Sequence, residues 1–275
     1  MPLNKKAFEI QFNWIFVLVA GAAILLFFAF VIVKQKNVSQ LSIEATVLKS
    51  IEAIIAGASV STYTVNIITL PNSDIEVSCN RVSIGRVSKQ YQSLILFAPG
   101  LIKGSKLITQ TMAFDLPYRA TTLLYMTSPQ IRYIIIGDAP LAKEINKSLP
   151  SELNKENYSS YGSALKIENY NNYKVRFIFF ENINIPDLNV PDSLAKMPDS
   201  DVTAVKINGD SEKGAIEFYV KNKLSWVKKG QSYYLTKPSL LGAIFSDTLE
   251  AYECNMKNVF SKIELVNGVY GHKVQ

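Results

Sequence analysis

The chain has 275 residues, of which 48% are hydrophobic and 19% are charged, with a mean hydropathy of +0.11 and a formal net charge of +6. This balance is too apolar for a disordered chain and too polar for a protein with many membrane spans. Two cysteines and a single histidine, His272, exclude a disulfide-dense scaffold and a four-cysteine zinc site, and they argue against most histidine-based catalysis.

The strongest signal is an apolar run near the amino terminus. Residues 15–33, from Ile15 to Val33, contain no charge and no hydrogen-bonding side chain. At about 1.5 Å per residue they form roughly 28 Å of helix, close to the roughly 30 Å hydrocarbon core of a bilayer. Trp14 and Lys34 stand at its two edges, where an amphipathic ring and a long basic stem reach the headgroups. We therefore predict a transmembrane helix at 15–33 after a short leader at 1–14.

A cleaved signal peptide is the competing interpretation of this run. The run is longer than the usual apolar core of such signals, and no small-residue cleavage site follows it. An uncleaved signal-anchor is therefore expected. Its direction is not determined by charge, because Lys5 and Lys6 on one side are balanced by Lys34 and Lys36 on the other.

Two features favour an extracytoplasmic location for the part that follows the anchor. Glycosylation sequons occur at 37–39, 146–148 and 157–159. Cys79 and Cys254 form an even pair, and a bridge between them would contribute on the order of 5 kcal/mol in the chain-entropy model. Two buried thiols remain the alternative.

The segment after the anchor divides into a helix and a β-rich part. Apolar residues at helical spacing, from Leu41 to Ile55, predict an amphipathic stalk helix at 37–58, whose stripe packs on the next segment or on a partner's helix. The pattern then changes to a β-rich segment at 59–130. Its expected antiparallel strands are 63–70, 75–79, 93–97, 106–114 and 121–125, with turns at 71–74, 98–100 and 116–117.

Residues 131–237 are expected to form an α/β segment. The predicted strands are 132–137, 174–180, 202–207 and 215–220, with helices at 139–148 and 192–196, a loop at 154–173 and a hairpin turn at 208–214. One long amphipathic helix at 238–270, capped by Ser239, should end the chain. The expected fold class is α+β or α/β.

Few residues of the chain are candidates for a catalytic or ligand-binding role. Asp138 follows a strand and precedes a helix, where α/β folds bind ligands, although an N-cap role is the simpler interpretation. Asp199 and Asp201 could present two carboxylates to Mg²⁺ or Ca²⁺, although a solvated turn explains them as well. No phosphate-binding glycine motif and no Gly-x-Ser-x-Gly elbow are present. We therefore expect no catalytic residue, cofactor or metal, while lysine- or carboxylate-based chemistry remains open; without a basic stripe, no nucleic acid is expected either.

Five short segments spread over most of the chain belong together: 5–16 (KKAFEIQFNWIF), 78–80 (SCN), 90–92 (QYQ), 123–129 (LLYMTSP) and 253–256 (ECNM). As a set, they resemble an uncharacterised family of single-pass membrane proteins from DPANN-type archaea. This resemblance implies an archaeal cell-envelope context and no particular activity.

The order of apolar helix, amphipathic continuation and β-rich head is also similar to type IV pilin-like subunits. Glu9 follows Phe8 directly, whereas bacterial type IV pilins place their glutamate several residues into the helix, and Gln11 and Asn13 interrupt the apolar stretch. The α/β half is also large for a pilin head. This second resemblance implies a filament or secretion-system subunit.

Together these observations predict a single-pass, membrane-anchored protein with an extracytoplasmic domain. We expect a binding or assembly role in the cell envelope, with the stalk helix or the carboxyl-terminal helix contacting a protein partner or a second copy. A pilin-like subunit and a membrane-tethered enzyme are the alternatives.

Overall fold

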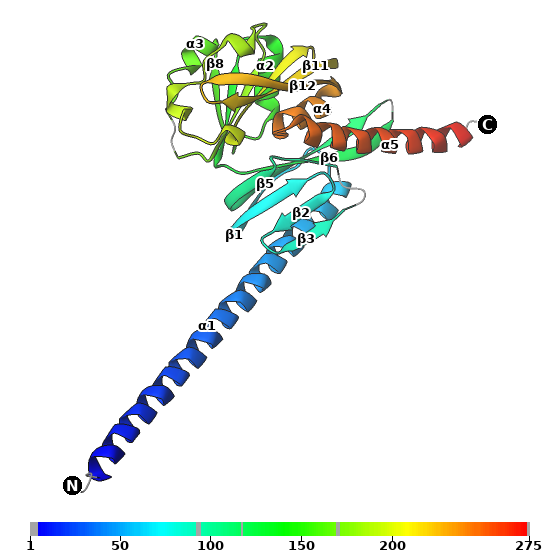
Figure 1. Cartoon of the computed structure of the whole chain (residues 1–275). Coiled ribbons are helices and arrows are strands. Elements are labelled where there is room, and N and C mark those ends of the chain that lie inside the picture. The colour runs from blue at the N-terminus through cyan, green and yellow to red at the C-terminus, as the bar shows by residue number, and fades with distance from the viewer. Residues whose placement is uncertain (1–4, 92–94, 117, 169–170, 274–275) are drawn as a thin grey trace. The chain divides into compact units, whose positions relative to one another are not determined.

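The computed structural model describes residues 5–91, 95–116, 118–168 and 171–273 (Figure 1). The chain divides into two compact units, Met1–Thr46 and Val47–Gln275. The predicted leader, membrane span and stalk belong to one continuous helix, α1 (Lys5–Val60). Residues 1–4 of the predicted leader lie outside the described residues.

The apolar part of α1 is exposed to its surroundings rather than buried in a core. Ile15 and Val33 are each 59% exposed, and Trp14 and Lys34 at its edges are exposed too. In the part of the chain that the structure describes, α1 is the one helix that is long and apolar enough to cross a membrane. Exposed apolar side chains over five turns are unfavourable in water and favourable in lipid.

The β-rich part forms a six-stranded sheet in the order β3-β2-β1-β5-β6-β4. All neighbours are antiparallel except β4 and β6. The strands are β1 (Val65–Ser78), β2 (Arg81–Ile84), β3 (Val87–Gln90), β4 (Leu96–Phe97), β5 (Leu101–Asp115) and β6 (Arg119–Thr127).

Two predictions for this sheet were wrong. The turn expected at 71–74 is part of β1, where the register against β5 shifts between Thr69 and Ser73. A bulge takes up the extra residues, so the strands predicted at 63–70 and 75–79 are one. The hairpin of β2 and β3 was not predicted, because each strand has only four residues, although β2 alternates polar and apolar residues.

The second sheet has the order β12-β11-β10-β9-β7-β8. Strands β8, β7, β9 and β10 are parallel to their neighbours. Strand β11 is antiparallel to β10, and β12 is antiparallel to β11. The strands are β7 (Ile131–Ile136), β8 (Asn154–Tyr158), β9 (Lys174–Phe179), β10 (Val202–Gly209), β11 (Lys213–Asn222) and β12 (Ser225–Leu235). Helices α2 (Pro140–Ser148) and α3 (Tyr161–Ala164) and the 3₁₀ turns η1 (Ile185–Asp187), η2 (Asp192–Leu194) and η3 (Asp199–Asp201) connect the parallel strands.

Here too the structure corrects the sequence analysis. The loop predicted at 154–173 contains β8 and α3, because its polar residues form an edge strand that hydrogen-bonds to β7. Strand β12 was not predicted. The single helix predicted at 238–270 is two helices, α4 (Thr236–Phe245) and α5 (Leu249–Lys273). The chain is extended at Ser246, and Thr248 then caps α5 by accepting the N–H of Ala251 at 3.2 Å.

Three cores hold these elements in layers, an α+β architecture. Val47, Leu48 and Ile51 from the end of α1 pack on one face of the first sheet. Helices α4 and α5 lie between the two sheets and share the largest core with both (Figure 1). Tyr161 and Trp226 belong to a third core on the outer face of the second sheet. The elements between the sheets therefore fix the geometry of the domain.

Gly242 permits the close approach of α4 to the first sheet. A Cβ atom there would lie 2.8 Å from the ring of Phe97, whereas one at Gly162 in α3 would meet nothing within 4 Å. We predict that Gly242→Ala lowers the free energy of unfolding by about 1–3 kcal/mol through overpacking. Gly162→Ala, the matched control, should be neutral or stabilising. Chemical unfolding followed by tryptophan fluorescence measures the free energy of unfolding of both variants. Equal changes in the two variants would contradict the contact.

Candidate functional site

The three aspartates singled out from the sequence lie at opposite ends of the parallel strands of the second sheet. Asp138 is exposed beyond the carboxyl end of β7, and Asp199 and Asp201 precede the amino end of β10. The predicted capping role of Asp138 is wrong, because Ala139 is the N-cap residue of α2 and no side chain caps that helix.

Asp199 and Asp201 have separate environments. The Asp199 carboxylate accepts a hydrogen bond of 2.5 Å from the ammonium of Lys221, a side chain that is only 1% exposed. This hydrogen bond lowers the pKa of Asp199. Asp201 instead lines a cleft beside Lys174 and Asp247. Within the described ranges, no group of three or more His, Cys, Asp or Glu side chains could hold a metal ion.

Cys79 and Cys254 form a disulfide, with their Cα atoms 6.0 Å apart. Cys79 follows β1 in the first sheet, and Cys254 lies in the second turn of α5. The structure thus adopts the bridged alternative of the two that the sequence left open. The bond ties α5 to the first sheet, where the side chain of Asn255 also accepts the N–H of Leu96 at 3.1 Å.

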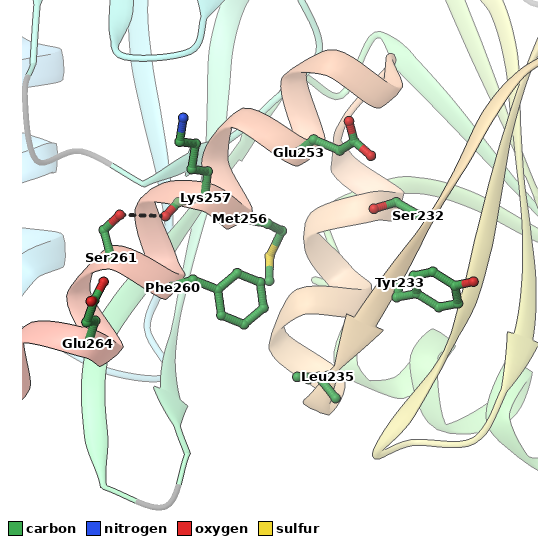
Figure 2. Close-up of a pocket in the computed structure, with 9 residues that line it drawn as sticks. All are labelled: Ser232, Tyr233, Leu235, Glu253, Met256, Lys257, Phe260, Ser261 and Glu264. Carbon is green, nitrogen blue, oxygen red and sulfur yellow. Dashed lines mark hydrogen bonds between the residues drawn. The ribbon is translucent and has the colours of Figure 1, made fainter. Parts of the chain in front are cut away.

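The other side of α5 forms a groove with the edge strand β12. Figure 2 shows Met256 and Phe260 pointing from α5 toward β12. The cavity between α5 and β12 has a volume of about 500 Å³. Its lining comprises Ser232, Tyr233 and Leu235 from β12 and Glu253, Met256, Lys257, Phe260, Ser261 and Glu264 from α5.

The groove exists because α5 is amphipathic and is held beside β12. Tyr252, Val259 and Ile263 recur at helical spacing and are buried in the core, so the opposite side of the helix faces outward. The Tyr252 hydroxyl donates a hydrogen bond of 2.9 Å to the carbonyl of Tyr233. This bond satisfies a polar group at the sheet edge and positions the helix.

Large apolar groups remain accessible in the groove. Tyr233 is 71% exposed and Phe260 46% exposed, while Met256 is buried at the base. The charged side chains of Glu253, Lys257 and Glu264 surround them. Exposed aromatic rings with a charged rim are typical of protein contact surfaces.

The sequence predicts a partner surface on the stalk helix or on the carboxyl-terminal helix, which stays a prediction, and it does not predict the β12 side of this groove. Tyr233 lies on β12, a strand absent from the prediction. The available signal was two pairs of strand-forming residues, Trp226-Val227 and Tyr233-Tyr234. Lys228, Lys229 and Gly230 stand between the two pairs and interrupt the pattern.

Comparisons of the chain with protein-family models, curated proteins and solved structures give no match.

The hydrogen bond between Tyr252 and Tyr233 is testable. Burial raises the pKa of the Tyr252 hydroxyl well above its ordinary value, so the group keeps its proton and donates. Tyr252→Phe should lower the free energy of unfolding by about 1 kcal/mol, because it removes this donor. The control Tyr63→Phe removes an exposed hydroxyl and should change stability by less than about 0.5 kcal/mol. The denaturant midpoint of each variant is compared with that of the wild type. An unchanged midpoint for Tyr252→Phe would argue against the contact.

Proposed function

We propose that this protein is a single-pass membrane-anchored assembly subunit. Its second unit, Val47–Gln275, is called the soluble unit here and lies on the extracytoplasmic side. It pairs with a second copy through the groove between α5 and β12. The anchor is α1, whose apolar run has the length that a bilayer requires.

The disulfide supports the extracytoplasmic side. Structural disulfides persist in oxidising compartments and are rare in the reducing cytosol. The bond between Cys79 and Cys254 closes a loop with a sequence separation of 175 residues and connects two elements of the core. Because a bridge in this position constrains the unfolded chain strongly, we place the soluble unit where the bond can form.

The charge pattern of the groove carries the self-pairing proposal. Lys257 and Glu264 are separated by seven residues, or two helical turns, so they lie on one face of α5 about 10 Å apart. In an antiparallel pair of α5 helices with its two-fold axis beside Phe260, each Lys257 faces the Glu264 of the other copy. One surface then supplies both halves of two identical ion pairs, as a two-fold interface requires.

The apolar groups fit the same arrangement. The two Phe260 rings would meet at the axis, and the exposed Tyr233 ring would be covered beside them. Ser261, whose hydroxyl donates to the Lys257 carbonyl at 3.0 Å, leaves room for close helix approach at the centre (Figure 2). Burial of exposed aromatic rings supplies the free energy, while the charges select the register.

A second copy explains the charges of the groove better than an unrelated helix. Among the residues that the structure describes, neither Lys257 nor Glu264 has an ion-pair partner in its own chain. One membrane anchor per chain confines copies to a plane, which raises their effective concentration and makes a small interface sufficient.

The location is tested by protease treatment of intact and lysed cells, read with an antibody against the carboxyl terminus. We expect the epitope to be lost in intact cells, because the soluble unit is outside. An epitope that survives until lysis would place that unit in the cytoplasm and refute the proposed side.

The pairing is tested by charge reversal in the full chain, reconstituted in lipid vesicles with fluorescent donor and acceptor labels at the carboxyl terminus. Lys257→Glu or Glu264→Lys alone should weaken association at least about tenfold, because each creates two like-charge contacts per dimer. The double variant restores both contacts with the signs exchanged and should regain energy transfer. Lys143→Glu on α2 is the control for a change of net charge.

Two results would refute self-pairing through this face. One is equal energy transfer in the wild type and in both single variants. The other is a double variant as weak as the single ones, which would indicate that each charge contacts a different molecule.

A further inference from the structure

A second cavity lies at the turn between α4 and α5 and shares no lining residue with the groove. It has a volume of about 470 Å³, within the range of small-molecule sites. Its walls come from η3, from the amino ends of β5, β9 and β10, from β11 and β12, and from the first turn of α5. It therefore lies at the amino ends of the parallel strands. Asp138, which the sequence analysis considered as a ligand residue, lies at the opposite, carboxyl ends.

One pair of charges in this cleft is already neutralised. The ammonium of Lys174 forms an ion pair with the carboxylate of Asp247, and both side chains are largely buried. Asp247 also accepts the N–H of Gly100 at 3.0 Å, and its backbone carbonyl accepts a hydrogen bond of 3.3 Å from Arg176. This network holds the α4–α5 turn on β9 and neutralises Lys174 within the lining, while the positive charge of Arg176 lies outside the lining of the cleft.

The rest of the lining is acidic and contains a buried hydroxyl. Beyond that pair, the charged side chains are Asp201, Glu250 and the exposed Lys229, a net charge of −1 from two carboxylates and one ammonium. No partner of the Asp201 or Glu250 carboxylate is present among the described residues. Thr203 also lines the cleft, is only 3% exposed, and its Oγ1 atom has no hydrogen-bond partner there.

A buried hydroxyl without a partner costs free energy, so a ligand that binds it is favoured. Phe218 and Leu101 add an apolar part to the lining. The cleft thus combines acceptors at one part of its wall with hydrocarbon at another.

We propose that this cleft binds a small primary amine with an apolar body. An ammonium group has three N–H donors and no acceptor, and Asp201, Glu250 and the Thr203 hydroxyl supply three acceptors. The positive charge balances the acidic lining, and the apolar body packs on Phe218. A divalent cation fits less well, because the described carboxylates do not form a metal-binding group.

The probe is 2-phenylethylamine, and 2-phenylethanol is the neutral analogue of nearly the same shape. Binding to the full chain in detergent micelles is measured by isothermal titration calorimetry. We expect the amine to bind at least about tenfold more tightly than the alcohol. A charge-assisted hydrogen bond is worth about 1.5–3 kcal/mol, which corresponds to that ratio or more.

Variants distinguish binding of the amine in the cleft from its partitioning into the detergent micelle. Asp201→Asn and Thr203→Val should each weaken amine binding about tenfold, because each removes one acceptor of the ammonium. Asp192→Asn, at an exposed carboxylate outside the cleft, should leave it unchanged. Thermal unfolding of each variant confirms that it is folded.

Three outcomes would overturn the proposal. They are no binding of the amine, equal binding of amine and alcohol, and equal loss in Asp201→Asn and Asp192→Asn. The test is independent of self-pairing, because none of these residues lines the groove.

Discussion

The placement of α4 and α5 between the two sheets is the constraint on which the rest of the unit Val47–Gln275 depends. Aromatic rings from both sheets meet there: the ring centroid of Phe245 in α4 lies 5.3 Å from that of Tyr125 in the first sheet and 5.8 Å from that of Tyr133 in the second. Gly242 lets α4 approach Phe97, and the disulfide at Cys254 holds α5 on the same sheet. Both cavities are consequences of this packing. The groove is the space between α5 and β12, and the cleft lies where the turn between the helices meets the amino ends of the parallel strands.

Buried charges show the same dependence on the helix turn. Lys174 and Arg176 point from β9 toward α4 and α5, where an unpaired cation would be costly. Asp247 neutralises Lys174, while Arg176 donates to the carbonyls of Ala243 and Asp247, groups that the break between the helices leaves without helical partners. A continuous helix, as predicted from the sequence, would have used those carbonyls internally. The break thus supplies an ion-pair partner for Lys174 and two carbonyl acceptors for Arg176, and it places Asp201 and Thr203 next to open space.

How far the sequence predicted the structure follows from the kind of signal in each segment. Nineteen uncharged residues predicted the apolar part of α1, and the buried strands β7 and β9 were recognised by their apolar runs at 133–136 and 177–179. Strands β8 and β12 were missed, since their residues are polar or interrupted by glycine and their stability comes from pairing with a neighbour. Asp199 and Asp201 looked like one pair of carboxylates, yet one neutralises a buried lysine and the other faces a cleft.

The sequence by itself determined the apolar helix, the α+β content and the amphipathic character of α5, because each depends on residues close together in the chain. Only the tertiary structure decided which groups meet: Cys79 with Cys254, Lys174 with Asp247, and Tyr233 beside Phe260. These contacts join residues separated by tens to hundreds of positions, and local periodicity carries no information about such pairs. Both candidate sites are built from contacts of this kind, which is why the sequence pointed to the helix and to Asp201 but not to the cavities that they line.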